Sequence, residues 1–204
     1  LTEYFKDTSI ETAFLLGKYC GLRINECFGL KWEDINLDNG EIYVKRQMQY
    51  QNGIIRLTSV KTRNAKRTIY IAPQLQEYLL DLKEKIQEAK EVMAEQREQN
   101  QIMIKDSDNQ PISSLELVNT LPNGKIRTVN SVKFHTRKIK TQYDITFKYH
   151  YLRHTYGTRL AELNTPTHLL CSQMGHASSK TTELYYLGVT ERGIDILTEN
   201  LSKI

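Results

Sequence analysis

The sequence has no run of about eighteen apolar residues, and it does not open with the pattern of a secretory signal. These absences argue against a membrane-spanning helix and against a visible export signal. An initiator methionine is missing as well, because the first residue is Leu1. We therefore expect a fragment of a longer protein.

Cysteine is scarce, with only Cys20, Cys27 and Cys171 among 204 residues. An odd number without paired spacing argues against a disulfide framework and favours reduced thiols in a protein of the cytoplasm, where the cysteines would be small core residues. The chain also lacks internal repeats and low-complexity linkers, while its length allows a substantial core. We predict a single domain over residues 1–204.

Net charge is low, since 28 basic and 24 acidic residues leave only +4. Its distribution is more informative. Residues 56–67 contain five basic side chains and no acid, and residues 125–140 contain six and no acid, whereas acids gather between Asp81 and Glu98. Basic patches of this kind attract a polyanion and release its counterions. For one patch taken alone, a solvated face explains the charges equally well.

The first third of the chain predicts short helices and then strands. Residues 2–7 should form a lead-in turn with a short helix, and residues 10–19 an apolar helix that Gly21 ends. Arg23 should open the next helix, with Glu26 one turn on as its partner. Apolar Leu22, Cys27, Leu30 and Ile35 can face a core. Taken alone, the Arg23–Glu26 pair is equally consistent with a structural ion pair.

Three segments rich in Ile, Val, Tyr and Thr, residues 41–49, 53–59 and 67–72, predict a three-stranded antiparallel sheet. Turn signals separate them. Lys61 lies in the second turn, where a lysine can enter a groove of bound DNA or protonate a leaving oxygen, and Lys66 is the competing candidate. A solvated turn is the default for an isolated lysine.

Helices dominate the rest, so the predicted class is α+β, mainly helical with a small sheet. Pro73 starts the longest helix, whose polar continuation through Gln101 should project into solvent; a coiled-coil partner is the alternative. Residues 106–125 read as loop with one short strand. Residues 129–143 predict another helix, with its basic side chains on the exposed side.

The stretch from His150 to Tyr185 carries most of the chemistry. His150 and Arg153 are three residues apart and share a helix face. Thr165 as N-cap and Pro166 as the first helical residue predict a short helix that ends before Gly175, which leaves His176 in the following turn. Guanidinium, imidazole and phenol groups suit a phosphodiester substrate.

A zinc site is the rival interpretation of the histidines. His150 and His154 are four apart, with His168, His176 and Cys171 further along the chain. Metalloprotease helices carry a glutamate directly after the first histidine, and here that residue is Tyr151. We therefore expect neither metal nor other cofactor, and interpret His154 and His168 as packing or surface residues.

Residue by residue, these segments resemble the tyrosine recombinases, the integrases of phages and mobile elements. That family has a His-x-x-Arg box, a Leu-Gly-His box and a nucleophilic tyrosine in this order. Here the boxes match His150 with Arg153, residues 174–176, and Tyr185, nine residues after His176. Met174 replaces the usual leucine, an apolar exchange that leaves the catalytic residues unaffected.

The resemblance extends to residues 21–35, which match the family's first-arginine box with Arg23. It implies that Tyr185 attacks the scissile phosphate and forms a 3′-phosphotyrosine, with Tyr186 as its helix neighbour. Arg23 and Arg153 would stabilise the phosphorane, while His150 and His176 add hydrogen bonds or proton transfer.

The family places its catalytic lysine on the hairpin that holds Lys61, which would therefore protonate the leaving 5′-oxygen. Lys66 remains open as the alternative. The other basic residues that we expect to contact DNA are Arg63, Lys66, Arg67, Lys133, Arg137, Lys138 and Lys140.

As a family expectation, the protein is a site-specific recombinase that acts as a homotetramer on two double-stranded DNA sites, through a Holliday junction and without ATP or metal. Residues 191–204 resemble the tail that docks on a neighbouring subunit, with packing in cis as the alternative. Accessory DNA-bending or directionality factors and association with the nucleoid are further expectations. The DNA site and a phage or transposon origin stay open. The other functions weighed are a type IB topoisomerase and a DNA-binding module without catalysis.

Overall fold

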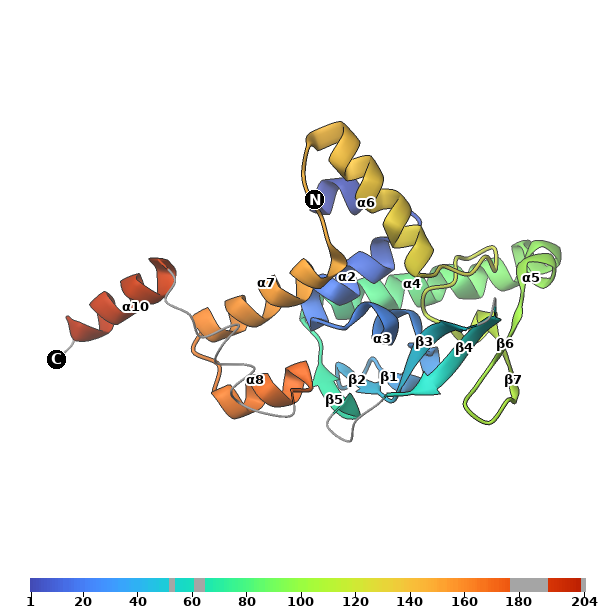
Figure 1. The fold of residues 1–204 in the computed structure, drawn as a ribbon. Helices are drawn as coiled ribbons and strands as arrows, with labels where there is room; N and C mark the ends of the chain where they lie inside the picture. Colours follow the sequence, from blue (N-terminus) through green and yellow to red (C-terminus); the bar gives the residue numbers. More distant parts are fainter. Residues whose placement is uncertain (52–53, 61–64, 177–190, 203–204) are drawn as a thin grey trace.

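The computed structural model describes residues 1–51, 54–60, 65–176 and 191–202. The chain forms a mainly helical body with strands along one side (Figure 1). Its helices are α1 (Thr2–Phe5), α2 (Glu11–Cys20), α3 (Ile24–Phe28), η1 (Trp32–Asp34), α4 (Pro73–Val92), α5 (Ala94–Asn100), η3 (Ser114–Glu116), α6 (Val129–Tyr143), α7 (Tyr149–Glu162), α8 (Thr167–Met174) and α10 (Glu191–Leu201). Its strands are β1 (Ile35–Asn36), β2 (Glu41–Val44), β3 (Arg46–Gln51), β4 (Ile54–Ser59), β5 (Arg67–Tyr70), β6 (Met103–Lys105) and β7 (Pro111–Ser113).

Helix α2 packs against α7, and this contact positions the α7 residues His150 and Arg153 (Figure 1). Gly17 allows the close approach, because a Cβ there would lie 2.8 Å from Leu152 and 2.9 Å from the Tyr149 ring. The Tyr149 hydroxyl donates to the carbonyl of Ala13 at 2.9 Å, deep in the core. The start of α7 is therefore fixed on α2 by both packing and a buried hydrogen bond.

The α+β class with a small antiparallel sheet is confirmed, but the three expected strands do not form one sheet. The segment predicted as residues 41–49 divides at Lys45 into β2 and β3. Antiparallel β1-β2-β5 forms one sheet, and β3-β4-β6-β7 forms another. Val44 pairs with Arg67, whereas Arg46 pairs with Ser59. Lys45 marks the change of partner, with an exposed side chain whose ammonium lies 3.3 Å from Asp34.

The far end of the long helix differs from the prediction. We expected it to project into solvent, yet Arg97 in α5 is buried and donates to the carbonyl of Pro122. Gly124, at φ +86°, lies so close that a Cβ would meet the Arg97 backbone at 2.8 Å. The loop between η3 and α6 thus covers α5. The segment between α5 and η3 contains β6, which the sequence did not predict, besides the expected short strand β7.

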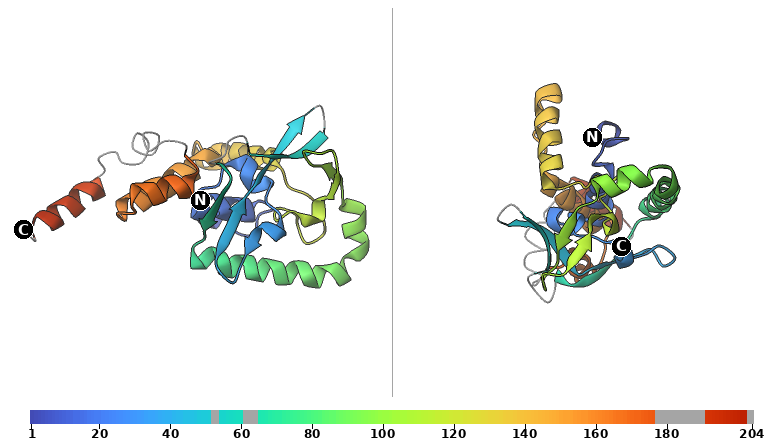
Figure 2. Two further views of the ribbon diagram at one scale, coloured as in Figure 1. Left: turned by 90° about the horizontal axis from the view of Figure 1, so that it is seen from below. Right: turned by 90° about the vertical axis from the view of Figure 1, so that its right-hand side faces the viewer.

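Helix α6 has the predicted bounds and stands out from the body beside α1 (Figures 1 and 2). Tyr4 and His135 join the two helices through a 3.0 Å hydrogen bond. The helix before Gly175 is confirmed as α8, although Pro166 is its N-cap rather than its first residue. Among the described helices, none is long and apolar enough to cross a membrane.

Candidate active site

Four of the predicted site residues come together at the junction of α3, α7 and the turn after α8. Arg23 precedes α3, His150 and Arg153 lie on α7, and His176 follows α8. Helix α8 packs on both α7 and β5, which brings these segments to one place (Figure 1). The predicted nucleophile Tyr185, the predicted general acid Lys61, and Arg63 lie outside the residues that the structure describes.

Arg153 is the buried centre of the cluster, with a relative exposure of 1%. Its Nη1 donates to the carbonyl of Gly21 at 2.7 Å, and its Nη2 donates to the carbonyl of Met174. Gly21 and Gly175, in left-handed conformations with φ of 60° and 64°, end α2 and α8. The guanidinium therefore joins the carboxyl ends of two helices.

His176 lies beside that guanidinium, with its Nε2 3.1 Å from Arg153 Nη2. Arginine has no acceptor, so Nε2 accepts and the ring carries its proton on Nδ1. Burial, followed by the positive charges of Arg153, Arg23 and Arg67, lowers the pKa of His176 to about 4. His176 is a neutral imidazole at neutral pH.

His150 shares this electrostatic environment. Its ring meets that of His154 edge to face, with centroids 4.5 Å apart. Burial is the main cause that lowers the pKa of His150, and His154, Arg153 and Arg23 lower it further. The cluster therefore combines permanent arginine charges with neutral imidazoles, a set of donors that suits an anion.

Arg23 is the accessible arginine of the cluster, with a side chain that is 41% exposed. Its Nη1 donates to Glu26 Oε1 at 2.8 Å, and its Nη2 donates to the carbonyl of Gly175 at 3.2 Å. The backbone N–H of Arg23 donates to Glu26 Oε2 at 3.0 Å, which closes the first turn of α3. Glu26 is thus the expected partner of Arg23.

Arg67 does not present its guanidinium to solvent, where a DNA contact was expected. Its side chain is only 4% exposed. Nη1 and Nη2 each lie 3.1 Å from an oxygen of Glu26, and Nε donates to the carbonyl of Gln173 at 3.0 Å. Sequence reasoning missed this role because Arg67 and Glu26 are 41 residues apart.

Gln173 is a second residue that sequence reasoning missed. Its Nε2 donates to the carbonyl of Tyr70 at 2.8 Å and to the hydroxyl of Tyr156 at 2.9 Å. Its Oε1 accepts the N–H of Tyr70 at 3.2 Å. The side chain therefore joins α8 to β5 and to α7, which fixes the turn that carries His176.

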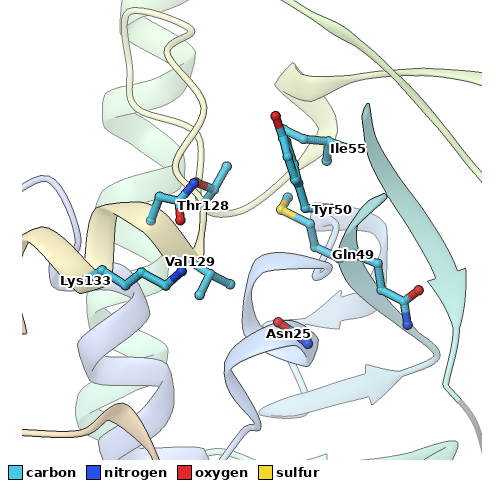
Figure 3. Close-up of a pocket in the computed structure, with 9 residues that line it drawn as sticks. Asn25, Gln49, Tyr50, Ile55, Thr128, Val129 and Lys133 are labelled. Carbon is cyan, nitrogen blue, oxygen red and sulfur yellow. The ribbon is translucent and has the colours of Figure 1, made fainter. Parts of the chain in front are cut away.

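Beside the cluster, a hollow of about 460 Å³ lies between the β3–β4 hairpin and the start of α6 (Figure 3). Asn25, two residues after Arg23, lines it together with Tyr50 and Lys133. The hollow mixes amide, ammonium and apolar groups. The other predicted DNA-contacting side chains that the structure describes are exposed: Lys66, Lys133, Arg137, Lys138 and Lys140.

No metal site replaces this arrangement within the described parts of the chain. There, no group of three or more His, Cys, Asp and Glu side chains could hold a metal ion. Burial in the core raises the pKa of Cys20 far above its usual value and that of Cys27 to about 12, so both thiols stay protonated.

Comparison with known proteins gives consistent results. The sequence profile of the phage integrase family matches residues 3–191. A XerC-like tyrosine recombinase of Caldanaerobacter subterraneus subsp. tengcongensis is 26% identical over 214 residues, with 100% of this chain and 52% of the relative covered. The integrase of a Staphylococcus phage is 26% identical over 187 residues, with 90% and 49% covered. The chain thus spans about half the length of these curated relatives.

Solved structures show the same fold. The Tn1549 transposon integrase bound to transposon right end DNA matches with a TM-score of 0.71 at 19% identity, covering 98% of this chain and 62% of that one. XerA recombinase matches with a TM-score of 0.64 at 17% identity, over 98% and 62% of the two chains. The resemblance to tyrosine recombinases is confirmed, and this chain belongs to the phage integrase family.

Proposed function

We propose that this chain is the catalytic domain of a site-specific recombinase that cleaves and rejoins DNA through a 3′-phosphotyrosine. The observation that carries the proposal is the meeting of Arg23 and Arg153 at the turn around Gly175, from segments 130 residues apart in the chain. Two guanidinium groups and two neutral imidazoles form a site for one phosphodiester.

Arg23 is placed to bind the scissile phosphate first, because its side chain is the accessible one. Arg153 and His176 then contribute from the floor of the site, where low exposure strengthens their interaction with developing charge. A bound phosphate raises the pKa of both His150 and His176, since a nearby anion favours the protonated ring. The site is therefore tuned to bind an anion rather than a neutral ligand.

In the proposed reaction the Tyr185 oxygen forms a bond to phosphorus while the bond to the 5′-oxygen breaks. A neutral imidazole accepts the phenol proton: His150, or His176 once its Nε2 no longer accepts from Arg153. Lys61 gives a proton to the leaving 5′-oxygen. The phosphotyrosine retains the energy of the phosphodiester. The 5′-hydroxyl of a partner strand reverses the step, so the proposed reaction requires neither ATP nor a metal.

Double-stranded DNA would lie across the cluster and the exposed side of α6. Lys133, Arg137 and Lys138 are exposed on α6, and Lys66 is exposed directly before β5. The hollow beside Asn25 would offer amide groups next to the reacting phosphate. Lys140 has a local partner in Asp144 at 2.6 Å, which makes it the weakest candidate of the group. Arg67, which is buried, is not among the proposed DNA contacts.

The assembly that we propose is a tetramer on two DNA sites, joined by exchange of the C-terminal helix. Helix α10 stands apart from the other helices (Figure 1), and Ile194 and Leu201 on it are more than half exposed. The relatives are named for a phage and a transposon, so integration and excision of a mobile element is the proposed role. We further propose that the full-length protein has DNA-binding domains upstream of this one and works with accessory factors. It would act in the cytoplasm, at the nucleoid.

A suicide DNA substrate tests the chemistry. When a strand is nicked next to the cleavage site, cleavage releases a short fragment that carries the 5′-hydroxyl. Its loss prevents rejoining, so the covalent intermediate accumulates and can be seen on a denaturing gel. The wild type should form a covalent adduct in the presence of chelators, and Tyr185→Phe should not. Tyr186→Phe is the matched control and should still form it. Strict dependence on a divalent metal would contradict the mechanism, and strand exchange between two duplexes separates a recombinase from a topoisomerase.

A further inference from the structure

One carboxylate lies among the positive charges of the cluster, and four N–H donors surround it. Glu26 Oε1 accepts from Arg23 Nη1 at 2.8 Å and from Arg67 Nη1 at 3.1 Å. Oε2 accepts from the Arg23 backbone at 3.0 Å and from Arg67 Nη2 at 3.1 Å. The Glu26 side chain is 3% exposed, so solvent screens these charges weakly.

This carboxylate creates a problem for phosphate binding. If Glu26 were paired with Arg23 alone, the two charges would cancel, and a phosphate would meet a neutral pair. Arg67 changes the balance because it adds a second positive charge on the inner side of Glu26. The two arginines and the carboxylate together carry a net charge of +1, and Arg23 is the member of the three that reaches the surface.

The two arginines differ in exposure, as expected if Arg67 neutralises Glu26 and Arg23 binds the phosphate. The Arg67 side chain is 4% exposed, whereas that of Arg23 is 41% exposed. Burial by itself raises the pKa of Glu26, but the hydrogen bonds and charges of Arg67 and Arg23 outweigh it and hold that pKa below its usual value. Glu26 therefore stays ionised and needs a counter-charge throughout the reaction.

We propose that Arg67 is a positioning residue that neutralises Glu26, so that Arg23 keeps both its orientation and its positive charge for the scissile phosphate. The inference rests on the proposed recombinase function.

Arg67 also supports the second group that holds Arg23. Arg23 Nη2 donates to the carbonyl of Gly175, and Arg67 packs against that residue, where a Cβ would lie 2.9 Å from Arg67 Cδ. The Nε of Arg67 donates to the carbonyl of Gln173, two residues earlier. Both acceptors of the Arg23 guanidinium, Glu26 Oε1 and the Gly175 carbonyl, are thus held in place by Arg67.

A double-mutant cycle separates this charge role from simple packing. Single-turnover cleavage of the suicide substrate is measured at saturating DNA, with Kd measured separately. Arg67→Met should slow cleavage about 10²-fold, because it weakens the donation of Arg23 to the phosphate; this is the lower end of the cost of losing such a donor. Adding Glu26→Gln removes the unbalanced negative charge, so the double variant should cleave about tenfold faster than Arg67→Met. A packing role alone predicts that the second substitution adds a further loss.

Arg97→Met is the matched control, since it removes another buried arginine from α5, outside the cluster. It should lower thermal stability and leave cleavage unchanged. Arg67→Lys keeps the positive charge with fewer donors and should retain most of the rate, which also covers the case in which Arg67→Met does not fold.

Several outcomes overturn the inference. The inference is wrong if Arg67→Met cleaves as fast as the wild type, or if Glu26→Gln does not rescue it. It is also wrong if Arg67→Lys and Arg67→Met lose the same share of the cleavage rate. The absence of any adduct from the wild-type protein would instead refute the proposed function, so the two failures are distinguishable.

Discussion

Arg153 and Arg23 meet at the same turn, but the fold holds them in different ways. Arg153 is 1% exposed and donates to backbone carbonyls at the ends of α2 and α8. Arg23 is 41% exposed and held by a carboxylate and one carbonyl. Carbonyls at helix ends are fixed with the helices, whereas the effect of a carboxylate depends on its other partners. Arg153 therefore belongs to the framework of the fold, and Arg23 is a group whose charge the surroundings adjust.

The strongest way to test this difference is Arg153→Ala. The change leaves buried carbonyl acceptors unsatisfied and opens a cavity, so we expect a loss of about 3 kcal/mol or more in unfolding free energy. Cleavage should fall about 10³-fold or more. Urea unfolding and the adduct assay measure the two effects. Arg159→Ala, an exposed arginine on the same helix, is the control. Equal stability of the two variants would show that Arg153 is not part of the framework.

Arg23→Ala should separate activity from stability. Glu26 keeps its contacts with Arg67, so the unfolding free energy should fall by only about 1 kcal/mol. Cleavage should still fall about 10²–10³-fold, because a donor to the phosphate is lost. Thermal unfolding and single-turnover cleavage measure this separation. A stability loss as large as that of Arg153→Ala would remove the distinction between the two arginines.

Gly175→Ala should disturb both arginine sites at once. The residue has φ +64°, and an added Cβ would meet the Arg67 guanidinium at 2.9 Å. We expect a stability loss of about 1–2 kcal/mol from the left-handed backbone, together with slower cleavage. Gly40→Ala is the matched control, because φ there is +63° but the nearest atom lies at 3.4 Å. Gly40→Ala should lower the stability without slowing cleavage. If cleavage by Gly40→Ala is also slower, general destabilisation explains the slower cleavage of both variants.

The smallest expected effect concerns pH and His176. Its pKa is lowered from 6.5 to about 4 in the folded protein, so the unfolded chain binds more protons between these values. Stability from this residue is complete above about pH 6.5 and falls as the pH drops towards 4. Urea unfolding across this range should give a flatter profile for His176→Asn than for the wild type. The exposed His168→Asn should keep the wild-type slope, and a flattening there would contradict the assignment.

Much of the site could be predicted because it depends on local patterns. Glycines after apolar helices predicted the ends of α2 and α8, and the spacing of His150 and Arg153 placed both on one helix. The bounds predicted for α6 agree with the structure, and its basic residues lie on the exposed side as expected. In each case the deciding contacts lie within a few residues of chain.

The rest depends on partners far away in the sequence. Arg67 was expected at the DNA because it stands in a basic run, but its acceptors Glu26 and Gln173 are 41 and 106 residues away. The burial of Arg97 likewise depends on Pro122, 25 residues further along. The break at Lys45 follows from which strands lie beside it. A local charge or hydrophobic pattern does not encode such contacts.

The hydrogen bonds of Gln173 to Tyr70 also have a consequence for solubility. Strand β5 is an outer strand of its sheet, and Tyr70 directs its N–H and carbonyl to the side away from β2. The Gln173 amide binds both groups as a neighbouring strand would. An unpaired edge can recruit a strand from another molecule and start aggregation. The amide that positions the His176 turn therefore also occupies the edge groups of Tyr70, so that these two groups do not pair with a strand of another molecule.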